Sequence, residues 1–334
     1  MISVEQYKPS LHDLWDEMVK NSRNGTFLHL RDYMDYHSDR FVDFSLIARD
    51  DDRIVAVLPA CREGNTLYSH RGLTYGSWLV PLKHFDVTTM LKVWDAAARF
   101  LRGAGVARIV YKAVPHIYHR YPCEEDLYVI FRNNGHLLES NISTTIDLDE
   151  PLPLDRGNKR NVNLAMKNGV EVGESCEWQA YWQMLDTLLM EKYGKHPVHT
   201  LDEILLLQSR FPENIGLFTA KHRGEMLAGV VMYCCGNEVA HCQYIASTEK
   251  GRQLKALTLL FDYLINESSQ AGYRYFDFGI STEDGGHYLN EGLVNQKCRL
   301  GGRGIVYNTD DGPTGQRVLA IVSQQEENTV GGVK

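Results

Sequence analysis

The clearest hydrophobic pattern in the chain lies between residues 254 and 270. Apolar side chains recur there every three to four positions, which places them on one face of an amphipathic helix. They are Leu254, Leu257, Leu260, Phe261, Leu264 and Ile265. Residues 241–247 predict a strand before this helix, and the alternating aromatic and polar residues 273–280 predict a strand after it. The region therefore predicts a parallel strand, helix and strand unit followed by a polar, Gly-rich loop.

A polar loop over residues 249–253 precedes this helix. The run Ser247, Thr248 and Glu249 offers capping residues before it, and Gly272 marks its end. Free backbone N–H groups and the helix dipole attract an anion such as a pyrophosphate to a helix N-terminus. An ordinary strand-to-helix turn is the alternative interpretation of this single Gly-containing loop.

The first half of the chain carries similar patterns. Apolar periodicity predicts helices over residues 11–19, 30–37 and 86–101. Hydrophobic runs predict strands over residues 44–48, 54–60, 67–73 and 107–114. Asp86 is placed to cap the longest helix, and an acidic turn joins the first two strands as a hairpin. The resulting order is a hairpin, a strand, a helix and a strand.

The same order recurs at an offset of about 170 residues in the second half. Arg-Phe at residues 40–41 is echoed at residues 210–211, and each of the five elements has a counterpart of the same kind. We therefore predict a mixed α/β fold built from two related tandem domains. The predicted domains cover residues 1–152 and 153–322, and the polar, Gly-containing tail over residues 323–334 is predicted to be disordered.

Composition narrows the function classes. The chain has 334 residues, a hydrophobic fraction of 43% and a charged fraction of 23%, which suit a two-domain globular protein. Its formal net charge of -8 argues against a protein that coats nucleic acid non-specifically, and we expect no DNA partner. No apolar run reaches membrane-spanning length and the first ten residues are polar, so we expect no membrane span and a cytoplasmic location.

The cysteines fit a reducing compartment, because the chain has seven of them and no CxxC pair. A metal site across a hairpin can be drawn from Cys234, Cys235, His241 and Cys242, but buried thiols in two paired strands are the favoured interpretation. His196 and His199 resemble a metal pair without a third ligand, and a bend at Pro197 favours a hydrogen-bonding role for His199. We predict no metal.

A basic segment lies between the two copies. Lys159, Asn163 and Lys167 recur at helical spacing, and Arg160 adds a further cation. Such a helix face suits a phosphorylated substrate. A solvated basic face is the alternative, and an RNA-binding factor that uses this helix is a weaker third interpretation of the chain.

At this point several motifs resemble a known family. They are NGTFLHLRDYMDYHSDRF, SHRGLTYGSW, KRNVNLAMKNGV, HPVHTLDEI, HCQYIAST, YFDFGIST and LNEGLVNQKCRLGGR. Together they span almost the whole chain and resemble the tandem acyltransferase domains of the GNAT superfamily, in particular the FemAB/FemX-type (FemABX) transferases and their bacterial relatives. The resemblance implies an N-acyltransferase in which a primary amine attacks an activated acyl carbonyl directly, without a covalent enzyme intermediate.

The resemblance leaves the donor open. The GNAT branch implies an acyl-CoA co-substrate, whereas the Fem branch implies aminoacyl-tRNA and a peptidoglycan-precursor amine. The loop KGRQLKA has Gly251 and Ala256 but not the usual spacing of the GNAT pyrophosphate loop. No sustained heptad run corresponds to the tRNA-binding coiled coil of the longer Fem enzymes. The alternative function is a degenerate, non-catalytic GNAT-like protein that binds a nucleotide-linked or peptide ligand.

Direct acyl transfer needs a deprotonated amine, a stabilised oxyanion and an acid for the leaving group. Lys297 matches the family's Gly-Leu-x-x-x-Lys segment and is the first candidate for the oxyanion or a donor phosphate. Asp277 and Glu283 flank the loop after the second-copy strand and are candidate bases, although Asp277 suits a structural role equally. Tyr244 is a candidate acid, with half-buried packing in the sheet as the alternative.

The remaining candidates divide into two groups. Donor-binding candidates are the residues around the two polar loops of the second copy: Ser247, Thr248, Gly251, Arg252, Gln253, Ser281 and Asn290. Acceptor-binding candidates lie at matching strand ends of the first copy and on the basic segment: Arg71, Tyr75, Lys112, Tyr118, Lys159, Arg160 and Lys167. On this interpretation the first domain forms the acceptor side and the second domain the donor side.

Overall fold

The computed structural model describes residues 1–236 and 238–314, and the predicted tail lies outside these residues. The fold is mixed α/β, as predicted, and it divides into two compact units. Among the described residues, unit 1 comprises Met1–Ser140 with Tyr307–Thr314, and unit 2 comprises Asn141–Val306. The division therefore falls before the predicted boundary at residue 152, and the chain returns to unit 1 at its end.

Unit 1 contains two groups of strands. One sheet has the order β1-β2-β3, and the other strands follow the order β4-β5-β6-β15. The strands are β1 (Ile2–Gln6), β2 (Leu46–Asp50), β3 (Arg53–Leu58), β4 (Cys61–Glu63), β5 (Thr66–Tyr68), β6 (Arg108–Lys112) and the part of β15 (Arg303–Pro313) that begins at Tyr307. The helices are α1 (His12–Asn21), α2 (Arg31–Met34), α3 (Val87–Gly103) and α4 (Glu125–Arg132). Short 3-10 helices cover Pro9–Leu11, Phe27–His29, Asp35–His37 and His116–Tyr118.

The long helix α3 forms as its sequence predicts. Asp86 caps it by accepting a hydrogen bond from the Thr89 backbone N–H at 2.8 Å. The apolar face of the helix, which includes Met90, Trp94 and Leu101, packs into the core of unit 1. The predicted strand over 67–73 is shorter than expected, because His70 takes a left-handed backbone with φ 51° and the chain turns away after β5.

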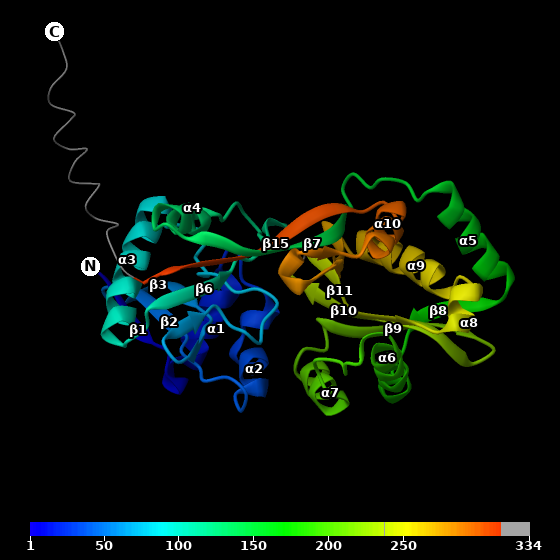
Figure 1. The fold of residues 1–334 in the computed structure, drawn as a ribbon, viewed down its shortest axis with the longest axis horizontal. Helices are drawn as coiled ribbons and strands as arrows, with labels where there is room; N and C mark the ends of the chain where they lie inside the picture. Colours follow the sequence, from blue (N-terminus) through cyan, green and yellow to red (C-terminus); the bar gives the residue numbers. More distant parts are fainter. Residues whose placement is uncertain (237, 315–334) are drawn as a thin grey trace, which may run out of the picture. The chain divides into compact units, whose positions relative to one another are not determined.

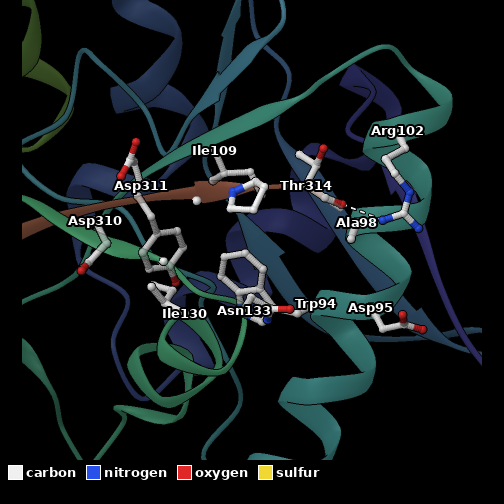
Figure 2. Close-up of a pocket in the computed structure, with 14 residues that line it drawn as sticks. Trp94, Asp95, Ala98, Arg102, Ile109, Ile130, Asn133, Asp310, Asp311 and Thr314 are labelled. Atoms are coloured by element: carbon white, nitrogen blue, oxygen red, sulfur yellow. Dashed lines mark hydrogen bonds between the residues drawn. The ribbon is translucent and has the colours of Figure 1, made fainter. Parts of the chain in front are cut away.

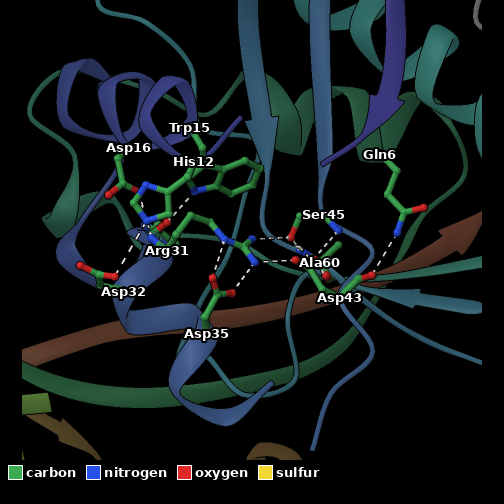
Figure 3. A network of polar contacts seen from close by, with 11 residues as sticks. Gln6, His12, Trp15, Asp16, Arg31, Asp32, Asp35, Asp43, Ser45 and Ala60 are labelled. Atoms are coloured by element: carbon green, nitrogen blue, oxygen red, sulfur yellow. Dashed lines mark hydrogen bonds and ion pairs between the residues drawn. The ribbon is translucent and has the colours of Figure 1, made fainter. Parts of the chain in front are cut away.

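A buried ionic network fixes the start of unit 1 (Figure 3). The Arg31 side chain on α2 is only 3% exposed, pairs with Asp35 and Asp43, and lies 3.9 Å from the ring centroid of Tyr7. Its backbone N–H donates to Asp16 of α1 at 2.9 Å. The desolvated guanidinium thus has acceptors and an aromatic face around it, which a buried charge requires. The network joins α1, α2 and the segment that leads into β2.

Unit 2 is one sheet with helices on both faces. Its strands follow the order β7-β12-β11-β10-β9-β8. They are the part of β7 (His136–Asp147) that begins at Asn141, β8 (Val170–Glu174), β9 (Ile215–His222), β10 (Glu225–Cys235), β11 (Val239–Ser247) and β12 (Tyr275–Ile280). The helices are α5 (Arg156–Lys167), α6 (Trp178–Tyr193), α7 (Leu201–Arg210), α8 (Glu249–Gln253), α9 (Ala256–Gln270) and α10 (Glu291–Arg299). A small hairpin of β13 (Thr282–Glu283) and β14 (Tyr288–Leu289) encloses the 3-10 turn Asp284–Gly286.

The two faces of the unit 2 sheet carry different helices (Figure 1). The helix α9 covers one face, where Leu260, Phe261 and Leu264 pack against Met232 and Phe276. The helices α6 and α7 cover the other face. The cysteines of β10 and β11 lie in these paired strands as predicted, with Cys235 and Cys242 buried.

Candidate functional site

The strands β11 and β12 separate in the middle of the unit 2 sheet. Their parallel pairing covers only Val239–His241 against Tyr275–Asp277, although β11 continues to Ser247 and β12 to Ile280. Gly279 has φ 76°, a left-handed backbone that glycine adopts without strain, and it turns the end of β12 away. The last paired residues, His241 and Asp277, therefore lie at the point of separation.

A β-bulge sits on β11 at the same level. Val231 of β10 pairs with Tyr244 and Met232 pairs with Cys242, so Gln243 is an extra residue. Cross-strand partners share a face of a sheet, and Val231 and Tyr233 are two residues apart on β10. Their partners Tyr244 and His241 consequently lie on the same face. The stacking of the Tyr244 ring on Trp182 of α6, with centroids 5.2 Å apart, shows that this is the α6-facing side.

Asp277 lies at the centre of a hydrogen-bond network on this face. Its carboxylate is fully buried and accepts hydrogen bonds from the Ser143 hydroxyl at 2.5 Å and the Thr145 hydroxyl at 2.8 Å. The Nδ1 atom of His241 lies 2.8 Å from the second carboxylate oxygen. A buried carboxylate needs such donors, and these come from two neighbouring strands. Asp277, a predicted base, is thus already engaged by hydrogen bonds and orients His241.

Lys297 lies on α10 and is 4% exposed. Its ammonium donates to the backbone oxygen of Gly279 at 2.7 Å, to that of Ile280 at 3.0 Å and to the Ser281 hydroxyl at 2.8 Å. Burial lowers its pKa to about 8, and the nearby Asp277 carboxylate opposes this shift. The side chain therefore fastens α10 to the segment that leaves β12. Contact with an oxyanion would require exchange of one of these three acceptors.

Tyr244 is held by the connection between α6 and α7. Its hydroxyl lies 2.5 Å from Nδ1 of His199, which is 5% exposed. The hydrogen-bonding role expected for His199 is present, whereas His196 pairs with Asp186 at 2.6 Å. Glu283, the other predicted base, is exposed on the β13–β14 hairpin. Asp277, His241 and Tyr244 thus share one face of the sheet, and Lys297 contacts the chain just beyond it.

A cavity of about 310 Å³ opens at the start of α9. Three cationic side chains line it: Arg252, Lys255 and Arg299. Leu257 and Thr258 of the first turn of α9 border it, as do polar residues of α5 and α10 that include Asn158, Asn161, Asn295 and Gln296. The first N–H groups of a helix lack intrahelical partners and attract anions. The cavity therefore combines positive charge with the N-terminus of a helix 15 residues long.

The backbone around this cavity is tightly specified. Thr248 caps α8 by accepting from the Gly251 N–H at 3.0 Å, as its place in the predicted capping run suggests. A Cβ atom on Gly251 would lie 2.3 Å from the Leu227 oxygen, so only glycine allows this approach of α8 to β10. Lys255 has φ 60°, and the left-handed residue separates α8 from α9. The helix predicted from residue 254 therefore begins at Ala256, and the short helix α8 precedes it.

The predicted donor residues are only partly gathered here. Gly251 and Arg252 line the cavity, while Gln253 is exposed beside it. Ser247 contributes its backbone oxygen to the Arg252 guanidinium at 3.0 Å. Ser281 contacts Lys297, and Asn290 caps α10 by accepting from the Leu293 N–H at 3.1 Å. Sequence reasoning missed Asn158, Asn295 and Arg299, because α5 and α10 reach the α9 terminus only through tertiary packing. It also missed Lys255, which lay inside the predicted helix.

The predicted acceptor residues of unit 1 contact other residues of the same unit. Tyr75 and Tyr118 are each 2% exposed, and the Tyr118 hydroxyl lies 2.8 Å from that of Tyr307. Arg71 pairs with Glu63, and Lys112 donates to the Leu73 oxygen at 2.9 Å. On α5 of unit 2, the side chains of the basic candidates Lys159, Arg160 and Lys167 are exposed to solvent.

Unit 1 also has a small cavity of about 60 Å³ near the end of α3. Figure 2 shows Trp94, Ala98, Ile109 and Ile130 around it, with Thr314 at one side. This volume is far below the several hundred Å³ of typical ligand pockets. Among the described residues, no three His, Cys, Asp or Glu side chains gather as metal ligands would. Nor does any helix within residues 1–236 and 238–314 have the length and apolar character to cross a membrane.

Comparison with known proteins clarifies unit 2. Residues 177–288, which include α6, α7, β11, α9 and β12, match the family model of the acetyltransferase (GNAT) domain. The chain contains a GNAT domain. No curated protein matches the chain by sequence. The separation of β11 and β12 lies within the matched residues, whereas the cationic cavity is lined both by matched residues and by residues of α5 and α10 outside them.

Solved structures extend the similarity to the whole chain. FemX has a TM-score of 0.65 at 12% identity, with 92% of this chain and 96% of FemX covered. L-PGS from Bacillus licheniformis has a TM-score of 0.60 at 14% identity, covering 98% and 99%. A tandem GNAT protein from the clavulanic acid biosynthesis pathway has a TM-score of 0.50 at 12% identity, covering 95% and 99%. The chain thus has a FemX-like fold of tandem GNAT-like domains, and the comparisons support an acyltransferase.

Proposed function

We propose that the protein is an N-acyltransferase that moves an acyl or aminoacyl group from an activated donor to a primary amine by direct attack. The cationic cavity at the start of α9, together with the separation of β11 and β12, carries this proposal. GNAT domains generally use acyl-CoA, whose pyrophosphate is the anion that such a helix terminus suits. The similarity to FemX and L-PGS brings aminoacyl-tRNA forward as the second donor, whose phosphodiester offers the same anionic chemistry.

The charges of the cavity suit an anionic donor. Arg252 and Lys255 approach it from the α8–α9 connection, and Arg299 approaches from α10. Arg299 is also paired with Asp155 at 2.5 Å, so Arg252 and Lys255 carry most of the uncompensated charge. Asn158, fixed by its hydrogen bond to the Arg299 oxygen at 3.0 Å, adds an amide at the rim. We assign the donor phosphate to these groups and the acyl carbonyl to the gap beyond His241.

The test is calorimetric binding of acetyl-CoA and, separately, of a non-hydrolysable aminoacyl-tRNA analogue. Arg252→Gln should weaken the donor that binds by about tenfold, since one charge-assisted hydrogen bond is lost. Lys250→Gln is the matched control, because Lys250 lies on the same short helix and pairs with Glu225 outside the cavity. Release of free thiol from acetyl-CoA in the presence of primary amines then measures turnover.

Each outcome separates the alternatives. Binding of acetyl-CoA that Arg252→Gln weakens, with thiol release, supports an acyl-CoA-dependent enzyme. Binding of the tRNA analogue alone supports an aminoacyl donor. Binding without turnover would instead favour a non-catalytic protein that recognises a nucleotide-linked ligand. The proposal fails if neither donor binds, or if Arg252→Gln and Lys250→Gln change affinity equally.

A further inference from the structure

We infer that His241, oriented by Asp277, is the group that accepts the proton of the acceptor amine, and that this amine approaches the α6-facing side of the unit 2 sheet as an alkylammonium ion. The inference rests on the proposed function and adds its acceptor side. It differs from the expectation drawn from the sequence, which assigned the base to Asp277 or Glu283 and the acceptor to unit 1. Three structural observations carry it.

The first observation is the tautomer of His241. The Nδ1 atom lies 2.8 Å from Asp277, whose carboxylate oxygens only accept hydrogen bonds when ionised. Nδ1 therefore carries the hydrogen in the neutral ring, and the lone pair is on Nε2. Ser143 and Thr145 bind the other carboxylate oxygen, which fixes Asp277 and through it the imidazole. A base oriented by a third group in this way is the arrangement that proton transfer requires.

The second observation is the position of His241 at the point where β11 and β12 separate. His241 is the last residue of β11 that pairs with β12, so its ring borders the gap between the strands. A Cβ atom on Gly279 would lie 3.5 Å from Cε1 of His241, which places the imidazole against the turn that ends β12. The side chain is 13% exposed whereas that of Asp277 is 0% exposed. Within the pair, His241 is thus the member that solvent and a substrate can reach.

The third observation is the face of the sheet on which His241 lies. The bulge at Gln243 puts Tyr244 on the same side as His241. The other titratable groups around His241 are Asp277 on β12, its cross-strand partner Tyr233 on β10, and Lys297 of α10 beyond Gly279. Tyr244 in turn contacts His199 from the α6–α7 connection. The donor cavity at α9 opens on the opposite side of the sheet, so donor and amine would approach the gap from different sides.

The chemistry balances as follows. The Nε2 lone pair of His241 takes one proton from the alkylammonium, which leaves a neutral amine and an imidazolium. The amine nitrogen attacks the acyl carbonyl carbon, and the bond from that carbon to the thioester sulfur or ester oxygen breaks. The leaving thiolate or alkoxide takes a second N–H proton, and the imidazolium releases its proton to solvent. The products are an amide, a free thiol or hydroxyl, and one proton.

The variant that tests this role is His241→Asn. The asparagine amide N–H₂ takes roughly the place of Nδ1–H and keeps a donor for Asp277, but it has no base at the Nε2 position. The matched control is His196→Asn, because His196 also contacts an aspartate yet lies exposed on the α6–α7 connection. Calorimetric titration with CoA shows whether the variants keep the donor site.

The discriminating assay uses two classes of acceptor with acetyl-CoA. Primary alkylamines are protonated at pH 7.5 and need a base, whereas hydroxylamine is mostly unprotonated and does not. His241→Asn should lower kcat/KM for alkylamines by about 100-fold or more. Its rate with hydroxylamine should stay within about threefold of the wild-type rate. Equal losses with both acceptors, or no loss with either, would overturn the assignment.

A second readout holds even without turnover. If wild-type protein releases no thiol with either acceptor, the proposed acyl-CoA donor fails, and nitrogen NMR of the imidazoles decides the role of His241 separately. The signal that disappears in His241→Asn should show that the neutral ring carries its hydrogen on Nδ1 and its lone pair on Nε2. The Nε2–H tautomer would contradict a base at this position.

Discussion

The two halves of the chain start from the same sequence of elements but treat the equivalent helix N-terminus differently. In unit 1 the carboxylate of Asp86 occupies the start of α3, where it accepts from Thr88 and Thr89. Those hydrogen bonds lower the pKa of Asp86, led by the Thr89 backbone N–H. In unit 2 the residue before α9 is the cation Lys255, and no side chain among the described residues caps the helix there. The N-terminus of α3 is thus capped by the Asp86 carboxylate, whereas the N-terminus of α9 can bind an external anion.

The strands beside these helices also differ between the two units: they stay paired in unit 1 and separate in unit 2. In unit 1, β5 stays in register with β6 over its whole short length, and β6 buries Ile109, Val110 and Tyr111. In unit 2, β11 and β12 part at His241 and Asp277. The hairpin β2–β3 joins β1 in a separate sheet, whereas the hairpin β9–β10 continues the sheet that contains β11. Duplication thus supplied two scaffolds, of which unit 2 retains both an open helix terminus and an open strand pair.

The strongest way to break this comparison is to transfer the cap of unit 1 into unit 2. Lys255→Asp places a carboxylate at the start of α9 in a left-handed conformation that aspartate tolerates. The variant loses a cation and gains an anion in the cavity, so donor affinity should fall by about 100-fold in calorimetry. Lys250→Asp makes the same charge change on α8 outside the cavity. An equal loss in that control would point to long-range charge rather than the terminus.

Lys297→Met tests the fastening of α10 to the end of β12. The substitution leaves the Gly279 and Ile280 oxygens without their donor, which should lower the free energy of unfolding by about 2 kcal/mol. The counterpart in unit 1 is Lys112→Met, where the ammonium has one close acceptor, the Leu73 oxygen at 2.9 Å. Urea denaturation should show the smaller loss for Lys112→Met. Equal losses would mean that the two lysines contribute equally to the free energy of unfolding.

The pKa of Lys297 adds a pH test. The folded value is about 8 and the unfolded value is 10.5, so between these pH values the unfolded chain binds a proton that the folded chain has released. The contribution of Lys297 to stability should therefore rise with pH, by about 2 kcal/mol between pH 7.5 and pH 9.5. Denaturation at both pH values should show this rise in wild type and its absence in Lys297→Met. A parallel rise in the variant would assign it to other groups.

Two helical glycines allow a matched test of packing. Gly251→Ala would bring a Cβ to 2.3 Å from the Leu227 oxygen, so α8 must move from β10 at a cost of about 2 kcal/mol. At Gly103, near the end of α3, an added methyl group would meet no atom within 4 Å, and alanine there should be neutral or stabilise by up to about 1 kcal/mol. Thermal unfolding of both variants measures the difference. Similar melting temperatures would contradict the close approach at Gly251.

The smallest expected effect concerns the cap of α3. Asp86→Ala removes the hydrogen bond to the Thr89 N–H and should lower stability by about 1 kcal/mol without any change in donor affinity. Asp86→Asn keeps an acceptor at the same position and should cost less. Loss of donor binding in Asp86→Ala would show that unit 1 also contributes to the donor site.

Local sequence patterns predicted much of the fold. The apolar face of α9 and the Asp86 cap of α3 could both be read directly, because a helix face and a cap depend on residues within a few positions of each other. Thr248 lay in the predicted capping run for the same reason. The break at Lys255 could not be read, since lysine has no preference for a left-handed backbone and the packing of α8 against β10 imposes it.

The candidate site depended more on tertiary structure. Sequence alone indicated that Asp277 and Lys297 belong to one region, but not that the ammonium binds backbone oxygens or that the carboxylate faces His241, 36 residues away. Simple alternation along β11 puts His241 and Tyr244 on opposite faces. The bulge at Gln243 reverses this, because register is set by pairing with β10 rather than by β11 itself. The sequence by itself thus determined the elements and their order, while the fold decided which side chains meet, because strand pairing and helix packing join residues far apart in the chain.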